Sequence, residues 1–248
     1  MTYEEMKART ELASLYRIFN YLGWTELIYN HITLRIPGPE KHVLINPFGL
    51  SYSEVTAENL VKIDLEGNII GESFWKYNLA GYTTHSVLHK NVPDAVCVMH
   101  THTTAGIAVA CLEQGLSYSN FYSAQLYNKV AYHNFEGITI YEDEGSRLIE
   151  SIAGKPAIIL RNHGLMGWGS TAAKAFSTLW ILNRACEIQC QSLAMGKALE
   201  ISEEVLKKCT ADSFHFNPTY GEGQDVLDAL TRIVNKLDPS YQSYGRID

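Results

Sequence analysis

Two histidines separated by one residue, His100 and His102, follow an apolar run at residues 95–99. A run of this length predicts a buried strand, and residues two apart on a strand project to the same face. A third histidine, His163, comes shortly after a second apolar run at residues 157–160. If both strands end at one edge of a sheet, the three imidazoles converge. Three neutral imidazoles are typical of a catalytic metal site, because they leave at least one coordination position open.

The elements that must position these histidines follow from the hydrophobic periodicity of the chain. A helical period predicts helices over residues 3–22, 82–90, 106–112, 144–153, 171–195 and 225–237. Short apolar runs bounded by turn residues predict strands over residues 31–36, 42–46, 60–64, 95–99, 138–141 and 157–160. The sequence therefore predicts an α/β domain with a mixed, mainly antiparallel sheet covered by helices.

The last part of the chain is more polar than the rest. We expect the main domain to span residues 1–210 and residues 211–248 to form a C-terminal extension with a short helix. This extension is expected to pack on the same domain or on a neighbouring subunit.

Composition and charge exclude several classes of function. The 248 residues include 27 acidic and 20 basic side chains, and the net charge of −7 disfavours nucleic-acid binding. No apolar run approaches the ~18 residues of a membrane span, and the N-terminus does not resemble a signal peptide. We therefore expect a cytoplasmic protein with a small-molecule substrate.

The five cysteines form no Cys-x-x-Cys pair, so we expect buried, unpaired thiols.

Three ordered motifs resemble those of the class II aldolase/adducin family. They are residues 94–103, which contain His100-Thr101-His102, the later Asn162-His163-Gly164-Leu165, and the early Asn30-His31-Ile32-Thr33. The likeness covers about residues 8–200, and the tail Asp238-Pro239-Ser240-Tyr241 is similar to that of the adducin-like branch.

The resemblance implies a three-layer α/β/α fold, which the family often assembles as a homotetramer. It implies that His100, His102 and His163 bind a divalent metal, usually zinc, with iron, manganese or cobalt as alternatives. This metal polarises a carbonyl group and stabilises an enediolate. We take Asn30, from the early motif at residues 30–33, and Asn46 as the candidate substrate-binding residues.

The chain departs from the sugar-phosphate aldolases of the family at one segment. Those enzymes have Ser-Ser-Glu ahead of the His-x-His pair, with serines that hold phosphate and a glutamate that moves the proton. Here Leu79-Ala80-Gly81 stands in that place, and Tyr29 replaces the usual glycine before the early Asn. A phosphorylated sugar is therefore a poor substrate, and the proton must come from another group.

Two residues are candidates for this proton transfer. His133 has a suitable pKa range, and Tyr122 lies near the position of a tyrosine acid in family aldolases. His133 is equally compatible with a surface loop, and Tyr122 is one of 15 tyrosines. His85 and His89 are spaced like metal ligands on a helix, but no accompanying carboxylate pattern supports a second metal site.

Three functions remain open at this point. The first is a metal-dependent lyase that acts on a non-phosphorylated carbonyl or carboxylate compound, by aldol-type cleavage or decarboxylation through a metal-stabilised enolate. The second is a non-catalytic, adducin-like interaction domain. The third is an Fe(II) oxygenase on the same fold, because three histidines also suit iron.

Overall fold

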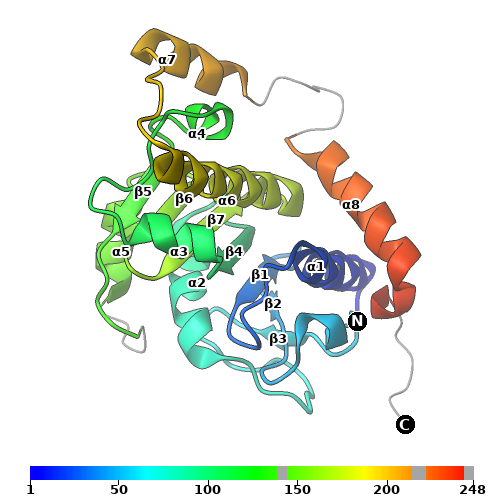
Figure 1. Ribbon diagram of the computed structural model, residues 1–248. Helices are drawn as coiled ribbons and strands as arrows, with labels where there is room; N and C mark the ends of the chain where they lie inside the picture. Colours follow the sequence, from blue (N-terminus) through cyan, green and yellow to red (C-terminus); the bar gives the residue numbers. More distant parts are fainter. Residues whose placement is uncertain (139–143, 214–221, 243–248) are drawn as a thin grey trace.

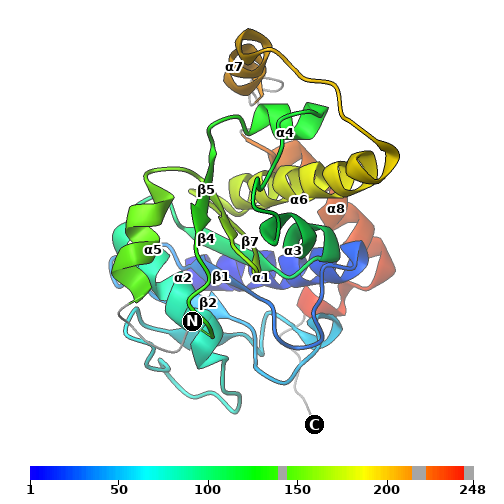
Figure 2. The same ribbon diagram turned by 60° about the vertical axis from the view of Figure 1, so that its left-hand side comes forward.

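A seven-stranded sheet forms the centre of the protein, in the order β3-β2-β1-β4-β7-β6-β5. The structure is a computed structural model that describes residues 1–138, 144–213 and 222–242 (Figures 1 and 2). The strands are β1 (His31–Arg35), β2 (Val43–Ile45), β3 (Val61–Ile63), β4 (Cys97–Thr101), β5 (Val130–His133), β6 (Ala157–Leu160) and β7 (Gly164–Gly169). Neighbouring strands are antiparallel, except that β5 and β6 run parallel. The predicted mixed, mainly antiparallel sheet is confirmed.

Helices cover both faces of this sheet (Figure 1). They are α1 (Tyr3–Leu22), α2 (Leu79–Asn91), α3 (Thr104–Ala110), α4 (Phe121–Gln125), α5 (Glu144–Ile152), α6 (Ala172–Met195), α7 (Glu203–Asp212) and α8 (Gln224–Leu237), with 3₁₀ turns η1 (Tyr52–Glu54) and η2 (Pro239–Gln242). On one face, Leu88 of α2 and Leu148 of α5 join the core formed by Val98 and Ile158. On the other face, α1, α3 and α6 share a larger core, which α8 extends. The three-layer α/β/α arrangement is thereby confirmed.

The two longest helices begin and end close to the predicted residues. Thr2 caps α1 by accepting a hydrogen bond from the Glu5 N–H, and Gly23 ends the helix at φ 72°. Thr171 caps α6 in the same way through the Lys174 N–H. No helix in the described part of the chain is long and apolar enough to cross a bilayer.

The glycine-rich segment at residues 164–169 differs from the expectation based on sequence. We expect Gly164, Gly167 and Gly169 to turn the chain toward the long helix, but this expectation is wrong because the segment is β7. The physical reason is the close approach of α6. A Cβ on Gly169 would lie 2.7 Å from the Ala175 nitrogen, and one on Gly167 would lie 3.2 Å from the Leu179 Cβ. With glycine at three of its six positions, the strand lacks the continuous apolar run that would predict it from the sequence.

Further differences concern short elements and single residues. The sequence does not predict α4, α7 or β5, which are short or follow segments without clear periodicity. The strand expected at residues 138–141 lies outside the described residues, apart from Ile138, which is exposed. Cys97 and Cys186 are buried as expected, whereas Cys190 and Cys209 are half-buried and Cys111, at the C-cap of α3, is exposed.

Buried histidines tie α2 to the sheet. The Thr33 hydroxyl of β1 lies 2.8 Å from His85 Nδ1 and 2.7 Å from His89 Nε2. His89 Nδ1 is 2.7 Å from the backbone oxygen of Ala95. Both histidines therefore have structural partners, in agreement with their interpretation from sequence.

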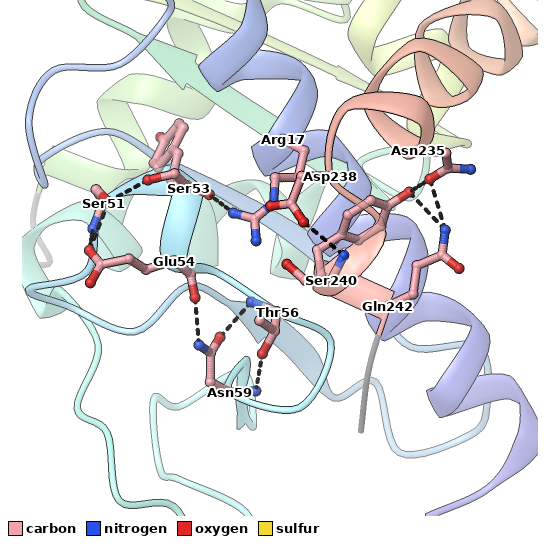
Figure 3. Close-up of polar contacts among 12 residues, drawn as sticks. Arg17, Ser51, Ser53, Glu54, Thr56, Asn59, Asn235, Asp238, Ser240 and Gln242 are labelled. Atoms are coloured by element: carbon pink, nitrogen blue, oxygen red, sulfur yellow. Dashed lines mark hydrogen bonds and ion pairs between the residues drawn. The ribbon is translucent and has the colours of Figure 1, made fainter. Parts of the chain in front are cut away.

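The C-terminal segment is held against α1 and η1 by polar contacts (Figure 3). The Arg17 guanidinium donates to the Tyr52 backbone oxygen at 2.9 Å and lies 3.5 Å from the Asp238 carboxylate. The Ala57 N–H donates to the Tyr241 backbone oxygen at 2.8 Å. The Tyr241 side chain is 1% exposed and belongs to the main core. These contacts hold residues 238–242 against α1 and η1 of the same chain, and the domain division at residue 210 stays a prediction.

We predict that Tyr241→Ala lowers the free energy of unfolding by about 3 kcal/mol, the usual cost of deleting a buried aromatic ring. Chemical denaturation measures this change. The control is Asp238→Asn, which removes a half-exposed ion pair and should cost less than about 1 kcal/mol. Equal effects of the two substitutions would contradict anchoring by the buried ring.

A second prediction concerns the pH dependence of stability. Burial lowers the pKa of His89 to about 3, and the nearby Arg35 adds to this effect. Because the unfolded chain takes up a proton near pH 6.5, stability is lost as the pH falls from 6.5 toward 3. Between pH 7 and pH 5, wild type should lose about 2 kcal/mol more than His89→Gln. Urea titrations at both pH values test this, and parallel losses in the two proteins would refute it.

Candidate functional site

The three histidines lie at one edge of the sheet, where neighbouring strands end or turn. His100 is in β4 and His102 follows it directly, while His163 lies in the turn between β6 and β7. Because β7 pairs with both β4 and β6, the end of β4 lies beside this turn. Asn162 allows the tight turn by adopting a left-handed conformation at φ 58°. The structure therefore brings together the three residues singled out from the sequence.

The three imidazoles form a compact triangle. Their ring centroids are 4.6 Å (His100–His102), 4.8 Å (His100–His163) and 4.9 Å (His102–His163) apart. One nitrogen from each ring lies within 4.8 Å of those of the other two. Nε2 of His100 and Nε2 of His102 are 2.8 Å apart, and two lone pairs at this distance need a proton or a cation between them.

Hydrogen bonding and burial prepare the rings to bind metal. His100 Nδ1 lies 2.9 Å from the Leu165 backbone oxygen. Because this oxygen only accepts, Nδ1 carries the proton and Nε2 keeps its lone pair. Burial lowers the pKa of His100 well below its ordinary value, that of His163 to about 4, and that of His102 to a lesser extent. The rings are thus neutral at pH 7, which is the form that binds a metal ion.

The residues present therefore fit a divalent cation. Three neutral imidazoles, one of them oriented by the Leu165 backbone oxygen, suit zinc, and they suit iron, manganese or cobalt as well. Among the described residues, these three histidines form the group of His, Cys, Asp or Glu side chains that lie close enough together to share an ion.

A cavity of about 450 Å³ opens in front of the cluster. Its polar lining comes from Glu26, His31, Asn78, Thr84 and Asn162. Its apolar lining comes from Tyr29, Phe135, Ile138, Leu160 and Met166. Ala80 and Gly81 complete the wall, and neither has a hydroxyl or carboxylate to offer a ligand.

The two asparagines proposed to bind substrate are not among the residues that line this cavity. Asn30 is buried, and its Oδ1 has no hydrogen-bond partner in the described structure. Asn46 is also buried, with Oδ1 2.9 Å from the Tyr16 hydroxyl that also bonds to the β1 backbone. Asn46 therefore has a structural partner, and the substrate-binding role of both residues stays a prediction.

The candidate proton donors, His133 and Tyr122, are also not among the residues that line this cavity. His133 is buried at the end of β5, so the surface-loop interpretation is wrong. Its Nδ1 lies 2.9 Å from the Ser151 hydroxyl, and its Nε2 lies 3.4 Å from the Glu144 carboxylate. Tyr122 packs edge-on against Trp180, with ring centroids 5.4 Å apart. Proton transfer by either residue stays a prediction.

Sequence reasoning assigned no role to several residues that line the cavity. His31 belongs to the early motif at residues 30–33. The sequence does not show that β1 pairs with β4, which places His31 opposite His100. Glu26 and Phe135 lie in loops, where no hydrophobic periodicity predicts which way a side chain points. The Glu26 carboxylate acts on His102 by raising its pKa, which offsets part of the lowering by burial.

Comparison with known proteins shows which chains this one is similar to. Residues 10–190 match the family model described as Class II Aldolase and Adducin N-terminal domain. A Caulobacter vibrioides protein named for the class 2 aldolases is 42% identical over 243 residues, which cover 97% of this chain and 93% of that protein. Alpha-adducin of Rattus norvegicus is 43% identical over 193 residues, which cover 77% of this chain but 26% of the adducin.

Solved structures extend the likeness to the fold. An aldolase II superfamily protein from Pseudomonas syringae has a TM-score of 0.91 at 35% identity, with 98% of both chains covered. L-fuculose 1-phosphate aldolase from Glaciozyma antarctica PI12 has a TM-score of 0.83 at 26% identity, covering 96% of this chain and 92% of that one.

We predict that His102→Ala abolishes binding of one equivalent of zinc, because two imidazoles cannot replace a three-ligand set. Metal analysis after dialysis measures the zinc content. His42→Ala is the matched control, since His42 lies beside Glu40 and not in the cluster. A full equivalent of tightly bound zinc in His102→Ala would show that the cluster is not the metal site.

Proposed function

Because the chain belongs to the class II aldolase and adducin family, we propose that it is a divalent-metal-dependent carbon–carbon lyase. Its proposed substrate is a non-phosphorylated carbonyl or carboxylate small molecule. The observation that carries this proposal is the triangle of neutral imidazoles at the wall of an open cavity. A cluster of this kind at a cavity wall has no evident structural purpose, because imidazoles withdrawn from water destabilise a fold unless their nitrogens find partners.

The histidines and the apolar lining of the cavity have separate roles at this site. His100, His102 and His163 would hold the cation, most suitably zinc, and the Leu165 backbone oxygen fixes the orientation of His100. A divalent cation bound there supplies Lewis-acid stabilisation of developing negative charge on a carbonyl or carboxylate oxygen. The apolar lining excludes water from the rest of the substrate and strengthens electrostatic interactions within the cavity.

The wall formed by residues 79–81 argues against sugar phosphates as substrates. Leu79 points to solvent with 65% of its surface exposed, while Ala80 and Gly81 offer no side-chain donor. Gly81 also cannot abstract a proton. A reaction that starts with loss of CO₂ from a β-keto or hydroxy-aryl acid needs no such base, so decarboxylation suits this site better than aldol cleavage.

A second candidate function is a non-catalytic, adducin-like interaction domain. The 43% identity to alpha-adducin, over a quarter of that protein's length, favours it. The Gly81 position, which lacks a proton-moving carboxylate, is compatible with this alternative.

We also propose that the chain is cytoplasmic and assembles as a homotetramer. Exposed aromatic side chains such as Phe121, at 61% exposure on α4, are typical of subunit interfaces. We predict a tetramer by light scattering at micromolar concentration. A monomeric mass under these conditions would contradict this assembly.

We predict that zinc-loaded protein turns over a β-keto or hydroxy-aryl acid, whereas turnover of L-fuculose 1-phosphate stays far below the usual enzyme rate of about 10 per second. A screen of carbonyl and carboxylate compounds, read by CO₂ or aldehyde release, makes the measurement. His102→Ala and metal-free protein serve as controls and should be inactive. A screen without turnover with any metal, including Fe(II) under O₂, would favour the interaction domain.

A further inference from the structure

His31 fills the space beside Gly81 at the edge of the histidine cluster. β1 pairs with β4 so that His31 stands opposite His100, with ring centroids 5.7 Å apart. A Cβ on residue 81 would lie 2.7 Å from both Cε1 and Nδ1 of His31. Such distances are too short for non-bonded atoms, so the His31 ring in this position and a side chain at residue 81 exclude each other. The absence of a side chain at Gly81 therefore makes room for an imidazole.

The fold leaves the nitrogen atoms of this imidazole available. The His31 side chain is buried, and neither ring nitrogen makes a hydrogen bond of good geometry within the described residues. Burial disfavours a charged ring, because a charged imidazole loses more hydration than a neutral one. The neutral ring offers one N–H donor and one lone pair. Because the ring lines the cavity, a bound ligand is the natural partner.

Packing behind the ring restrains it. His85 contacts His31 with ring centroids 4.2 Å apart. Because the Ala95 oxygen only accepts, His89 Nδ1 carries a proton and His89 Nε2 accepts from the Thr33 hydroxyl. The same hydroxyl then accepts from His85 Nδ1. This chain of hydrogen bonds fixes His85 and keeps His31 from turning away from the cavity.

The charge of the cavity limits the ligands that it can take. The described lining contains no Lys or Arg, and Glu26 is its one carboxylate. A cation at the histidine cluster would therefore be the main positive charge, sufficient for one anionic group but not for a second carboxylate or a phosphate. Phe135, Leu160 and Met166 leave an apolar surface for the remainder of the ligand.

Building on the proposed function of this same site, we propose that His31 is a substrate-binding residue. Its imidazole hydrogen-bonds an oxygen of a monoanionic oxo or hydroxy acid, the class that includes the β-keto and hydroxy-aryl acids proposed above. The apolar substituent of that acid lies against Phe135 and Leu160. Gly81 contributes by leaving room for the ring.

Calorimetric titration of zinc-loaded protein with benzoylformate, a 2-oxo acid with an aryl substituent, tests the role of His31. His31→Phe keeps a ring of similar shape but removes both nitrogens. It should retain one equivalent of zinc and bind benzoylformate about tenfold more weakly, the usual scale for one lost hydrogen bond. The matched control His42→Phe, at a histidine that does not line the cavity, should bind like wild type. 2-Oxoglutarate, with its second carboxylate, should bind wild type at least tenfold more weakly than benzoylformate.

The outcomes separate this inference from the proposed function. Equal benzoylformate affinity in wild type and His31→Phe, with zinc retained in both, overturns the role of His31 but leaves the metal site intact. Loss of zinc from His31→Phe assigns the ring to the support of the metal site and also overturns it. No benzoylformate binding by zinc-loaded wild type overturns the ligand class. Absence of stoichiometric zinc from wild type overturns the proposed function and the inference together.

A double-mutant cycle tests the shared space between residues 31 and 81. Gly81→Ala should lower both the melting temperature and the benzoylformate affinity, because the new Cβ displaces the His31 ring. In a His31→Ala background the same substitution should raise the melting temperature, because alanine favours a helix more than glycine does. The same direction of change in both backgrounds would overturn the steric argument.

Discussion

The antiparallel pairing of β4 with β1 on one side and β7 on the other is the constraint on which the site depends. It sets His31 opposite His100 and brings the turn with His163 to the end of β4. The register is firmly fixed because β4 is buried along its length, and a slip of one residue would move every side chain to the opposite face. The rigid sheet thus positions the imidazoles, and the surrounding loops supply the rest of the cavity.

Placing several histidines in one buried layer carries a free-energy cost that the surroundings reduce. Each ring loses water, and a charge on one ring disfavours a charge on its neighbours, so burial keeps the rings neutral. Backbone oxygens of Leu165 and Ala95 and the Thr33 hydroxyl partner the nitrogens of three of these rings. The nitrogens that remain without partners lie in the cluster or beside it, where a cation and a ligand would complete the coordination and hydrogen bonding.

The substitution pattern at this wall is coherent when residues 31 and 81 are considered together. A carboxylate at residue 81 and an imidazole at residue 31 cannot share the observed space, since even a Cβ there meets the ring. The chain therefore has a histidine cluster that could hold a metal ion and, beside it, a buried imidazole in the space that a side chain at residue 81 would need.

The sequence by itself determined the helices and strands with strong periodicity, the α/β class and the three histidines that converge. These features depend on local patterns, namely apolar spacing, capping residues and a His-x-His pair at the end of a strand. The tertiary structure alone decided that residues 164–169 form a strand, because close packing against α6 requires glycine there. It also decided that His31, and not His133 or Tyr122, lines the cavity beside the three histidines. Strand pairing and helix packing bring together residues far apart in the chain, and no local pattern encodes the distance between them.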